Sequence, residues 1–246
     1  MSDDRPNLLL ITTDEQRFDY LGLLASTPVR TPTIDALAEA GAYHPWTYTV
    51  NPVCVPARCS LLTGLYSHQH GVMHNRGDLS GGLATLAAAL SALGYETALV
   101  GKEHFYEGFV DLTETREITK ESFGWDYLRS VAGKSMASGV PGYRDAAEDE
   151  WTHYLAERSL LESCRQSTSY GMGRRARGEC EAGPSVFPEE HHVDFRVKEE
   201  TIAYLRQRRD GTPFFLWSSF CSPHFPFDPP KRYLERYRWS DMPVPT

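Results

Sequence analysis

Short apolar segments recur along the chain, and each is bounded by acidic, proline or glycine residues. A run of about four to eight residues rich in β-branched and aromatic side chains is typical of a strand buried in a sheet. The segment PFFLWSSF is the strongest of these runs, and it leads directly into the proline-rich loop CSPHFPFDPP. The pattern predicts strands at residues 7–13, 42–50, 96–102 and 213–220.

Helical periodicity occupies several of the intervals between these strands. Thr33 is placed as the N-cap of a helix that carries Ile34, Leu37 and Ala38 on one face and ends at Gly41. The same reasoning predicts helices at residues 83–93 (ended by Gly94), 146–161 and 195–210 (with Phe195, Ile202 and Leu205 on one side).

Strands that alternate with helices predict an α/β fold, with a mostly parallel sheet sandwiched by helices. Between residues 105 and 190 the periodicity weakens, and charges, glycine and serine become frequent. We expect this part to be a variable, elaborated surface region. The chain of 246 residues is long enough to bury a sizeable core without disulfides or metals as supports.

Composition and charge exclude several classes of protein. The net charge of −8 argues against a nucleic-acid partner, which would favour a basic face. No segment approaches the roughly 18 apolar residues of a membrane helix, and the N-terminus is acidic where a signal peptide would be basic. Five scattered cysteines do not resemble a disulfide framework. We therefore predict a cytoplasmic protein with reduced thiols and no membrane contact.

Reactive side chains follow three of the predicted strands, where parallel sheets usually bind their ligands. Asp14 and Glu15 follow the first, Lys102 and His104 the second, and His224 lies in the proline-rich loop after the last. Adjacent acids are often only solvated, although paired carboxylates also hold hard divalent cations. Two interpretations are open for Lys102 and His104: the two side chains bind an anion together, or they face solvent. A rigidly presented histidine serves as an acid or base, or as a helix cap.

The stretch NPVCVPARCSLLTG decides among these readings. Cys54, Pro56 and Arg58, followed by Leu62-Thr63-Gly64, resemble the C-x-P-x-R signature of type I sulfatases. Leu65 stands where the family usually has arginine, at a position peripheral to the chemistry. The segment GYETALVGKEHF resembles the second family signature, and the first strand and the histidine loop resemble two further blocks in the same order. The chain is thus identified as a member of the sulfatase family, with an alkaline-phosphatase-like fold.

The resemblance implies a formylglycine made from Cys54 by a dedicated maturation enzyme. Its hydrate has one hydroxyl to attack the sulfur of a small-molecule sulfate ester and another to let the sulfated residue collapse, whereas a serine could do only the first. Asp14, Glu15 and residue 54 would hold a divalent cation, with Ca²⁺ favoured over Mg²⁺ or Mn²⁺.

The family also implies roles for the remaining site residues. Arg58 and Lys102 would stabilise charge on the sulfate. His104 would assist the collapse. His224 would bind the substrate together with Lys102 and protonate the leaving oxygen.

Two further readings stay open. A formylglycine-dependent phosphonate monoester or phosphodiester hydrolase would share the fold and the oxidised cysteine. A non-catalytic remnant would bind an anion or a partner protein and would retain an unmodified thiol. Family members are longer and carry another strand with metal ligands after the histidine loop, so residues 1–246 are expected to be the N-terminal part of a catalytic domain. The particular ester and the oligomeric state do not follow from the sequence.

Other reactive residues are expected to have structural roles. Cys59 is predicted to be a packing thiol, and the pair His191-His192 to cap or line the start of a helix, or to contact substrate. His68 and His70 have metal-like spacing but resemble a structural stretch of the family, and GRRARGEC is predicted to be a solvated loop.

Overall fold

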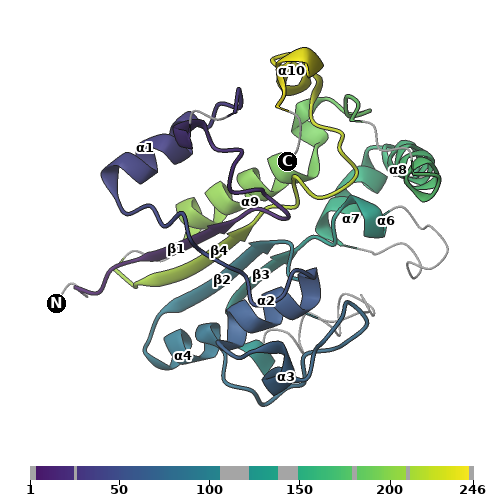
Figure 1. Cartoon of the computed structure of the whole chain (residues 1–246). Coiled ribbons are helices and arrows are strands. Elements are labelled where there is room, and N and C mark those ends of the chain that lie inside the picture. Colours follow the sequence, from purple (N-terminus) through teal and green to yellow (C-terminus); the bar gives the residue numbers. More distant parts are fainter. Residues whose placement is uncertain are drawn as a thin grey trace.

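A computed structural model describes residues 4–24, 27–105, 122–137, 149–178, 182–208 and 211–243. Four parallel strands form one sheet in the order β1-β4-β2-β3 (Figure 1). The mostly parallel α/β fold is therefore confirmed. The strands are β1 (Leu8–Thr12), β2 (Glu96–Gly101), β3 (Tyr127–Ser130) and β4 (Phe214–Ser219).

Helices cover the two faces of this sheet, as Figure 1 shows. One face bears α2 (Cys54–Thr63), α3 (Ser67–His70) and α4 (Leu86–Ala92). The other bears α7 (Glu150–Glu157) and α9 (Val193–Gln207). The remaining elements are η1 (Gly22–Leu24), α1 (Pro32–Ala40), α6 (Lys134–Ala137), α8 (Leu161–Ala176), η2 (Glu189–His191), α10 (Lys231–Leu234) and η3 (Trp239–Asp241).

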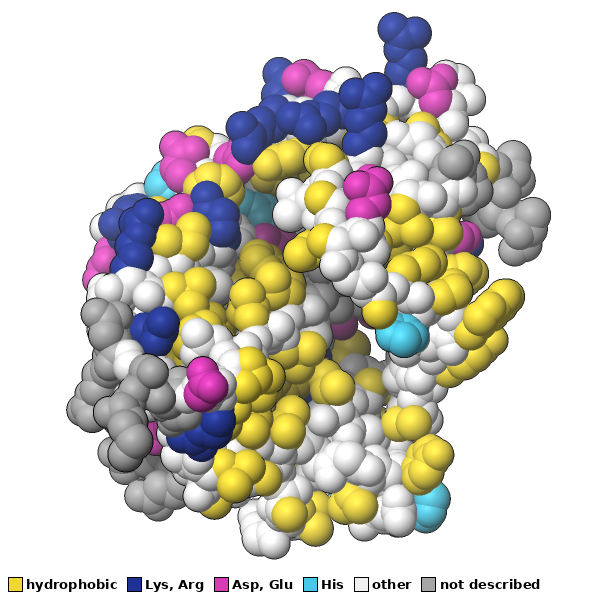
Figure 2. All heavy atoms as spheres, turned by 90° about the vertical axis from the view of Figure 1, so that its left-hand side faces the viewer, with side chains coloured by type: hydrophobic (Ala, Val, Ile, Leu, Met, Phe, Trp, Pro, Cys, Tyr) yellow, Lys and Arg dark blue, Asp and Glu magenta, His cyan; other side chains and the backbone are white. Residues whose placement is uncertain are grey.

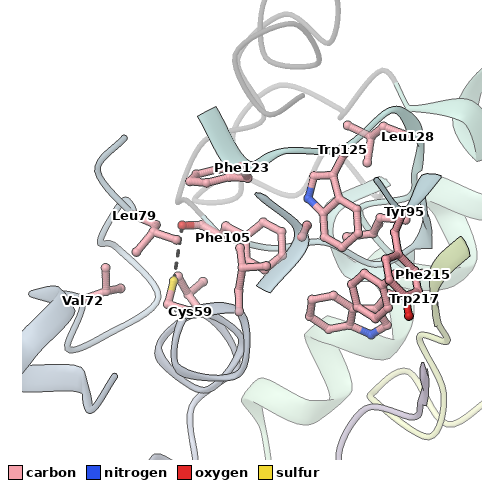
Figure 3. Close-up of a cluster of buried hydrophobic side chains, with 14 residues drawn as sticks. Cys59, Val72, Leu79, Tyr95, Phe105, Phe123, Trp125, Leu128, Phe215 and Trp217 are labelled. Carbon is pink, nitrogen blue, oxygen red and sulfur yellow. Dashed lines mark hydrogen bonds between the residues drawn. The ribbon is translucent and has the colours of Figure 1, made fainter. Parts of the chain in front are cut away.

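A buried aromatic cluster fixes α2 on the sheet (Figure 3). Trp125 and Phe105 both lie against Trp217 of β4, with ring centroids 6.3 and 5.8 Å apart. The Cys59 thiol on α2 is buried in the same cluster and points at the carbonyl oxygen of Phe105, 3.7 Å away. Because Cys59 is fully buried within this cluster, its predicted packing role is confirmed. Burial also raises the pKa of the thiol to about 12.

Several predicted elements are correct in type and nearly so in extent. The strands at 7–13, 96–102 and 213–220 and the helices at 83–93 and 195–210 are all present. The first helix begins at Pro32 with Thr31 as its N-cap, so Thr33 lies inside the first turn. The buried face of α9 consists of Val193, Val197 and Tyr204 rather than the predicted set, because the sheet meets the helix on that side.

Four predictions are wrong. Residues 42–50 form no strand: they are mostly exposed and have no ladder partner in the described structure. The segment 105–190 is not only surface, because it supplies β3 and the fully buried Trp151 and Leu155. The expected helix at 146–161 is shorter, with 146–148 outside the described residues. A second helix, α8, includes part of the expected loop GRRARGEC, whose last two residues also lie outside the described part.

One face of β1 is uncovered. Leu9 pairs in register with Leu216 and shares its face of the sheet, yet Leu9 is 50% exposed while Leu216 is fully buried. Helix α9 covers β2 and β4 but not β1, so Ile11 is likewise 54% exposed. Figure 2 shows hydrophobic side chains spread over the face of the molecule on this side. No helix among the described residues is long and apolar enough to cross a membrane.

Candidate active site

The carboxyl ends of β1, β2 and β4 meet at one edge of the sheet, where α2 also begins. Asp14 comes two residues after β1, Lys102 directly after β2, and the loop with His224 after β4. Ligand atoms of Asp14, Cys54 and His224 all lie within 4.8 Å of one another. Residues that are far apart in the sequence therefore form one cluster, as their positions at strand ends predict.

Cys54 is the first residue of α2, and two asparagines hold the turn before it. The Asn51 side-chain oxygen accepts a hydrogen bond from the backbone amide of Val53 at 2.9 Å. The Asn75 side-chain oxygen accepts one from the backbone amide of Val55, also at 2.9 Å. The thiol is half-buried. Burial raises its pKa, although Lys102 acts in the opposite direction. The raised pKa keeps this thiol protonated at neutral pH.

Asp14 is buried beside two cations. Its Oδ2 accepts a hydrogen bond from Lys102 Nζ at 2.5 Å and lies 3.7 Å from Arg58 Nη2. Burial alone would raise the pKa of this carboxyl, but the charges of Lys102 and Arg58 lower it overall. Asp14 is therefore ionised at neutral pH, and the three residues form a desolvated charge cluster next to Cys54.

Arg58 is held in place by the ends of two strands. Its Nη1 donates to the Lys102 carbonyl at 2.7 Å and to Ser219 Oγ at 2.9 Å. This fixes the guanidinium one turn into α2, facing the same cluster as Cys54. Ser219 is not among the residues predicted from the sequence, although the change from apolar residues to serine at the end of PFFLWSSF marks its position.

His224 and Glu15 lie together at the more open side of the cluster. The Nδ1–H of His224 donates to the carbonyl of Phe225 at 2.6 Å, which leaves Nε2 facing the site. That Nε2 lies 3.6 Å from Glu15 Oε1. Glu15 is not part of the three-residue group formed by Asp14, Cys54 and His224 within the described structure. The backbone of Glu15 has a positive φ of 64°, so a tight turn directs the Glu15 side chain toward His224.

His104 lies beside the cations. Burial is the main reason why the pKa of His104 falls well below its usual value, and the charges of Lys102 and Arg58 lower it further. The imidazole is therefore neutral at physiological pH and can accept a proton only when a negative charge develops nearby. Its backbone has a φ of 54°, which turns the chain sharply after Lys102.

The donor set fits a divalent cation in part. The Asp14 carboxylate is a hard oxygen ligand, and a hydrated residue 54 would add a second. The ring nitrogen of His224 suits Ca²⁺ poorly, since this ion takes about six to eight oxygen ligands. Among the described residues, Asp14 and residue 54 would therefore supply only part of the oxygen ligands of such a cation, and Oδ2 of Asp14 is bonded to Lys102.

The fold and this cluster define an α/β protein of alkaline-phosphatase-like architecture. The sulfatase family model matches residues 6–246, so the chain belongs to the sulfatase family. It is 30% identical over 244 residues to an arylsulfatase of Clostridium perfringens, covering 98% of this chain and 48% of that protein. It is 32% identical over 241 residues to an N-acetylglucosamine-6-O-sulfatase of Bacteroides thetaiotaomicron, with 98% and 35% covered.

Solved structures agree with the fold. The phosphonate monoester hydrolase of Agrobacterium radiobacter superposes with a TM-score of 0.71 at 25% identity, over 98% of this chain and 45% of that one. A structure solved in complex with D-glucosamine-2-N,6-O-disulfate superposes with a TM-score of 0.66 at 19% identity, over 99% and 40%. The chain spans less than half of the length of each of these relatives.

The histidines outside the cluster have structural contacts. His70 Nε2 bonds to Ser60 Oγ at 2.9 Å and so joins α3 to α2, while His68 is exposed. His192 caps α9, because its Nδ1 accepts the amide of Asp194 at 3.3 Å. Neither pair lies in a metal-binding group of the described residues. The expected capping role of the pair His191-His192 is thus confirmed for His192.

Proposed function

We propose that this chain carries the nucleophile side of a sulfatase active site, which hydrolyses a small-molecule sulfate ester. The observation that carries the proposal is the position of Cys54 at the start of α2, beside the buried Asp14–Lys102–Arg58 cluster. The signature residues Cys54, Pro56 and Arg58 support the conversion of Cys54 to formylglycine by a maturation enzyme. The hydrated aldehyde would supply an attacking hydroxyl.

Each remaining residue has a proposed role in this site. Asp14 would hold the divalent cation together with residue 54, and Glu15 is a proposed additional ligand if it turns away from His224. Lys102 and Arg58 would bind the sulfate oxygens and stabilise their charge. His104, which is neutral, would accept a proton from residue 54. The cation would lower the pKa of the attacking hydroxyl. We propose Ca²⁺, with Mg²⁺ or Mn²⁺ as alternatives, because carboxylate oxygens suit all three ions.

A phosphonate monoester or phosphodiester hydrolase is the second candidate. It is favoured by the match to the Agrobacterium radiobacter enzyme at 25% identity. The match to the sulfatase family model and the names of the two sulfatase relatives favour a sulfate ester as substrate. A non-catalytic remnant is the third candidate. The cytoplasmic location is likewise a proposal, supported by the four free cysteines among the described residues.

A side-by-side activity assay tests the proposal. The protein is co-expressed with a formylglycine-generating enzyme, and peptide mass spectrometry confirms the aldehyde at residue 54. We expect hydrolysis of an aryl sulfate to exceed that of the matching aryl phosphonate and phosphodiester, and Cys54→Ala to abolish it. The matched control is Cys59→Ala, a buried cysteine of the same helix outside the site. A residue 54 that stays wholly a thiol, or a preference for the phosphonate, would reject the proposal.

His224→Ala is expected to slow esters with poor leaving groups far more than activated aryl esters. His224 Nε2 faces the site, and a general acid contributes about 10²- to 10⁴-fold only where the leaving oxygen needs a proton. The measurement is kcat/KM over a series of aryl sulfates whose phenols differ in pKa. Equal losses across the series would show that His224 does not protonate the leaving group.

A further inference from the structure

The loop that carries His224 is tied to the end of β1. The amide of Phe220 donates to the carbonyl of Thr12 at 2.8 Å, and the amide of Asp14 donates to the carbonyl of Ser222 at 3.2 Å. The separation between His224 and Asp14 therefore depends on where Ser222 is held. Whatever fixes Ser222 also sets the geometry of the cluster.

Asp194 holds Ser222 from the opposite side. Its Oδ1 accepts the amide of Cys221 at 2.7 Å and that of Ser222 at 3.2 Å. Asp194 is the second residue of α9, where a carboxylate usually stabilises its own helix. Here the side chain instead bonds to two consecutive amides of a loop 27 and 28 residues away in the sequence.

The support of Asp194 is itself rigid. The His192 ring lies between Asp194 and Lys134, with its Nδ1 3.3 Å from the Asp194 amide nitrogen and its Nε2 2.8 Å from Lys134 Nζ. Lys134 also pairs with Asp228, farther along the His224 loop. The loop is thus held near its start by Asp194 and near its end by Lys134. All of these groups are wholly or mostly buried, which strengthens the hydrogen bonds among them.

We propose that Asp194 is a positioning residue, which places the His224 loop against Asp14 by accepting two loop amides through one oxygen. The inference rests on the proposed function, since that function gives His224 and Asp14 their roles. Nothing in the family signatures discussed above selects Asp194. Without its oxygen, the two amides lose their acceptor and Ser222 is no longer fixed relative to Asp14.

Two substitutions separate the position of the oxygen from the charge. Asp194→Asn keeps an oxygen in place and removes the charge, whereas Asp194→Glu keeps the charge and moves the oxygen by one methylene. Hydrogen exchange of peptides covering residues 13–18 and 220–225 reports the Asp14–Ser222 bond, and the β2 peptide serves as the reference for global opening. The control is Asp35→Ala, since Asp35 is also a first-turn carboxylate that accepts a distant amide, that of Leu23 at 3.0 Å.

We expect Asp194→Glu to speed exchange at Asp14 by about ten- to a hundred-fold, and Asp194→Asn to stay within about threefold of the wild type. Asp35→Ala should leave the exchange rate of the peptide covering residues 13–18 unchanged. Slow exchange in the glutamate variant, or fast exchange in the asparagine variant, would overturn the proposal.

A second measurement is the kcat of the Asp194 variants for esters with different leaving groups. Asp194→Glu should lower kcat more for poor leaving groups than for activated ones, as expected when His224 is displaced. Equal loss for both would contradict the positioning of His224. If a version extended by the following reading frame also hydrolyses no ester, the proposed function is refuted. The exchange measurement, which needs neither metal nor substrate, would still decide the role of Asp194.

Discussion

Asp14→Ala is expected to abolish measurable Ca²⁺ binding and to reduce the free energy of unfolding by about 3–5 kcal/mol at pH 7. Asp14 is the buried carboxylate between Lys102 and Arg58, and its removal leaves two desolvated cations without their counter-charge. The loss should be smaller in acid. Since the pKa of Asp14 is lowered in the folded state, its stabilisation is present above the ordinary value of 3.8 and disappears as the pH falls below it.

Calorimetric Ca²⁺ titration and urea unfolding measure the two effects separately. Asp14→Asn should retain part of the stability, because the amide oxygen still accepts from Lys102, but it should bind Ca²⁺ poorly. Asp19→Ala is the control, since Asp19 is a partly exposed carboxylate five residues later whose ion pair in the described structure is with Arg17. Unchanged Ca²⁺ affinity in Asp14→Ala would rule this residue out as a ligand.

The strand ends explain why much of the site could be predicted. A fully buried strand such as β4 is a continuous apolar run, so its last residue is visible in the sequence. Parallel strands present their carboxyl ends at one edge, and this brings Asp14, Lys102 and His224 together without knowledge of the packing. Cys54 and Arg58 came from the family signature, because neither lies on a strand.

The features that the sequence did not predict depend on contacts between distant segments of the chain. Strand β3 is only four residues long and alternates in burial, so its local signal is weak. The aromatic segment at residues 42–50 has β-forming side chains but no neighbouring strand. Asp194 and Asn75 act through hydrogen bonds to amides of another segment, and no spacing rule in a single sequence identifies such partners.

The predicted position of the open sheet edge was also wrong. Because longer relatives carry another strand after the histidine loop, the sequence predicts that β4, the strand before this loop, lacks a neighbour. Instead β4 lies between β1 and β2, and β1 is an edge strand with Leu9 and Ile11 exposed. The order of strands in space is not their order in the chain, so a missing neighbour cannot be assigned from sequence order alone.

The 246-residue chain alone is expected to bind Ca²⁺ weakly and to turn over sulfate esters at least about a hundredfold more slowly than a version extended by the following reading frame. Asp14 and residue 54 supply few of the roughly six or more oxygens that Ca²⁺ takes. The apolar face of β1 is open, and helix α1 has no buried residue. Additional chain could supply both the missing ligands and a cover for Leu9 and Ile11, since this chain spans less than half of its relatives.

The comparison uses both chains with the residue 54 modification confirmed, and follows Ca²⁺ affinity, kcat/KM and sedimentation. The short chain should self-associate through the exposed β1 edge, and the double substitution of Leu9 and Ile11 by lysine should make it monodisperse without restoring activity. Substituting Leu37, an exposed leucine of α1, is the matched control for added charge. Robust Ca²⁺-dependent sulfatase activity from a monodisperse 246-residue chain would contradict this prediction, because the cluster around Cys54 would then be complete as it stands.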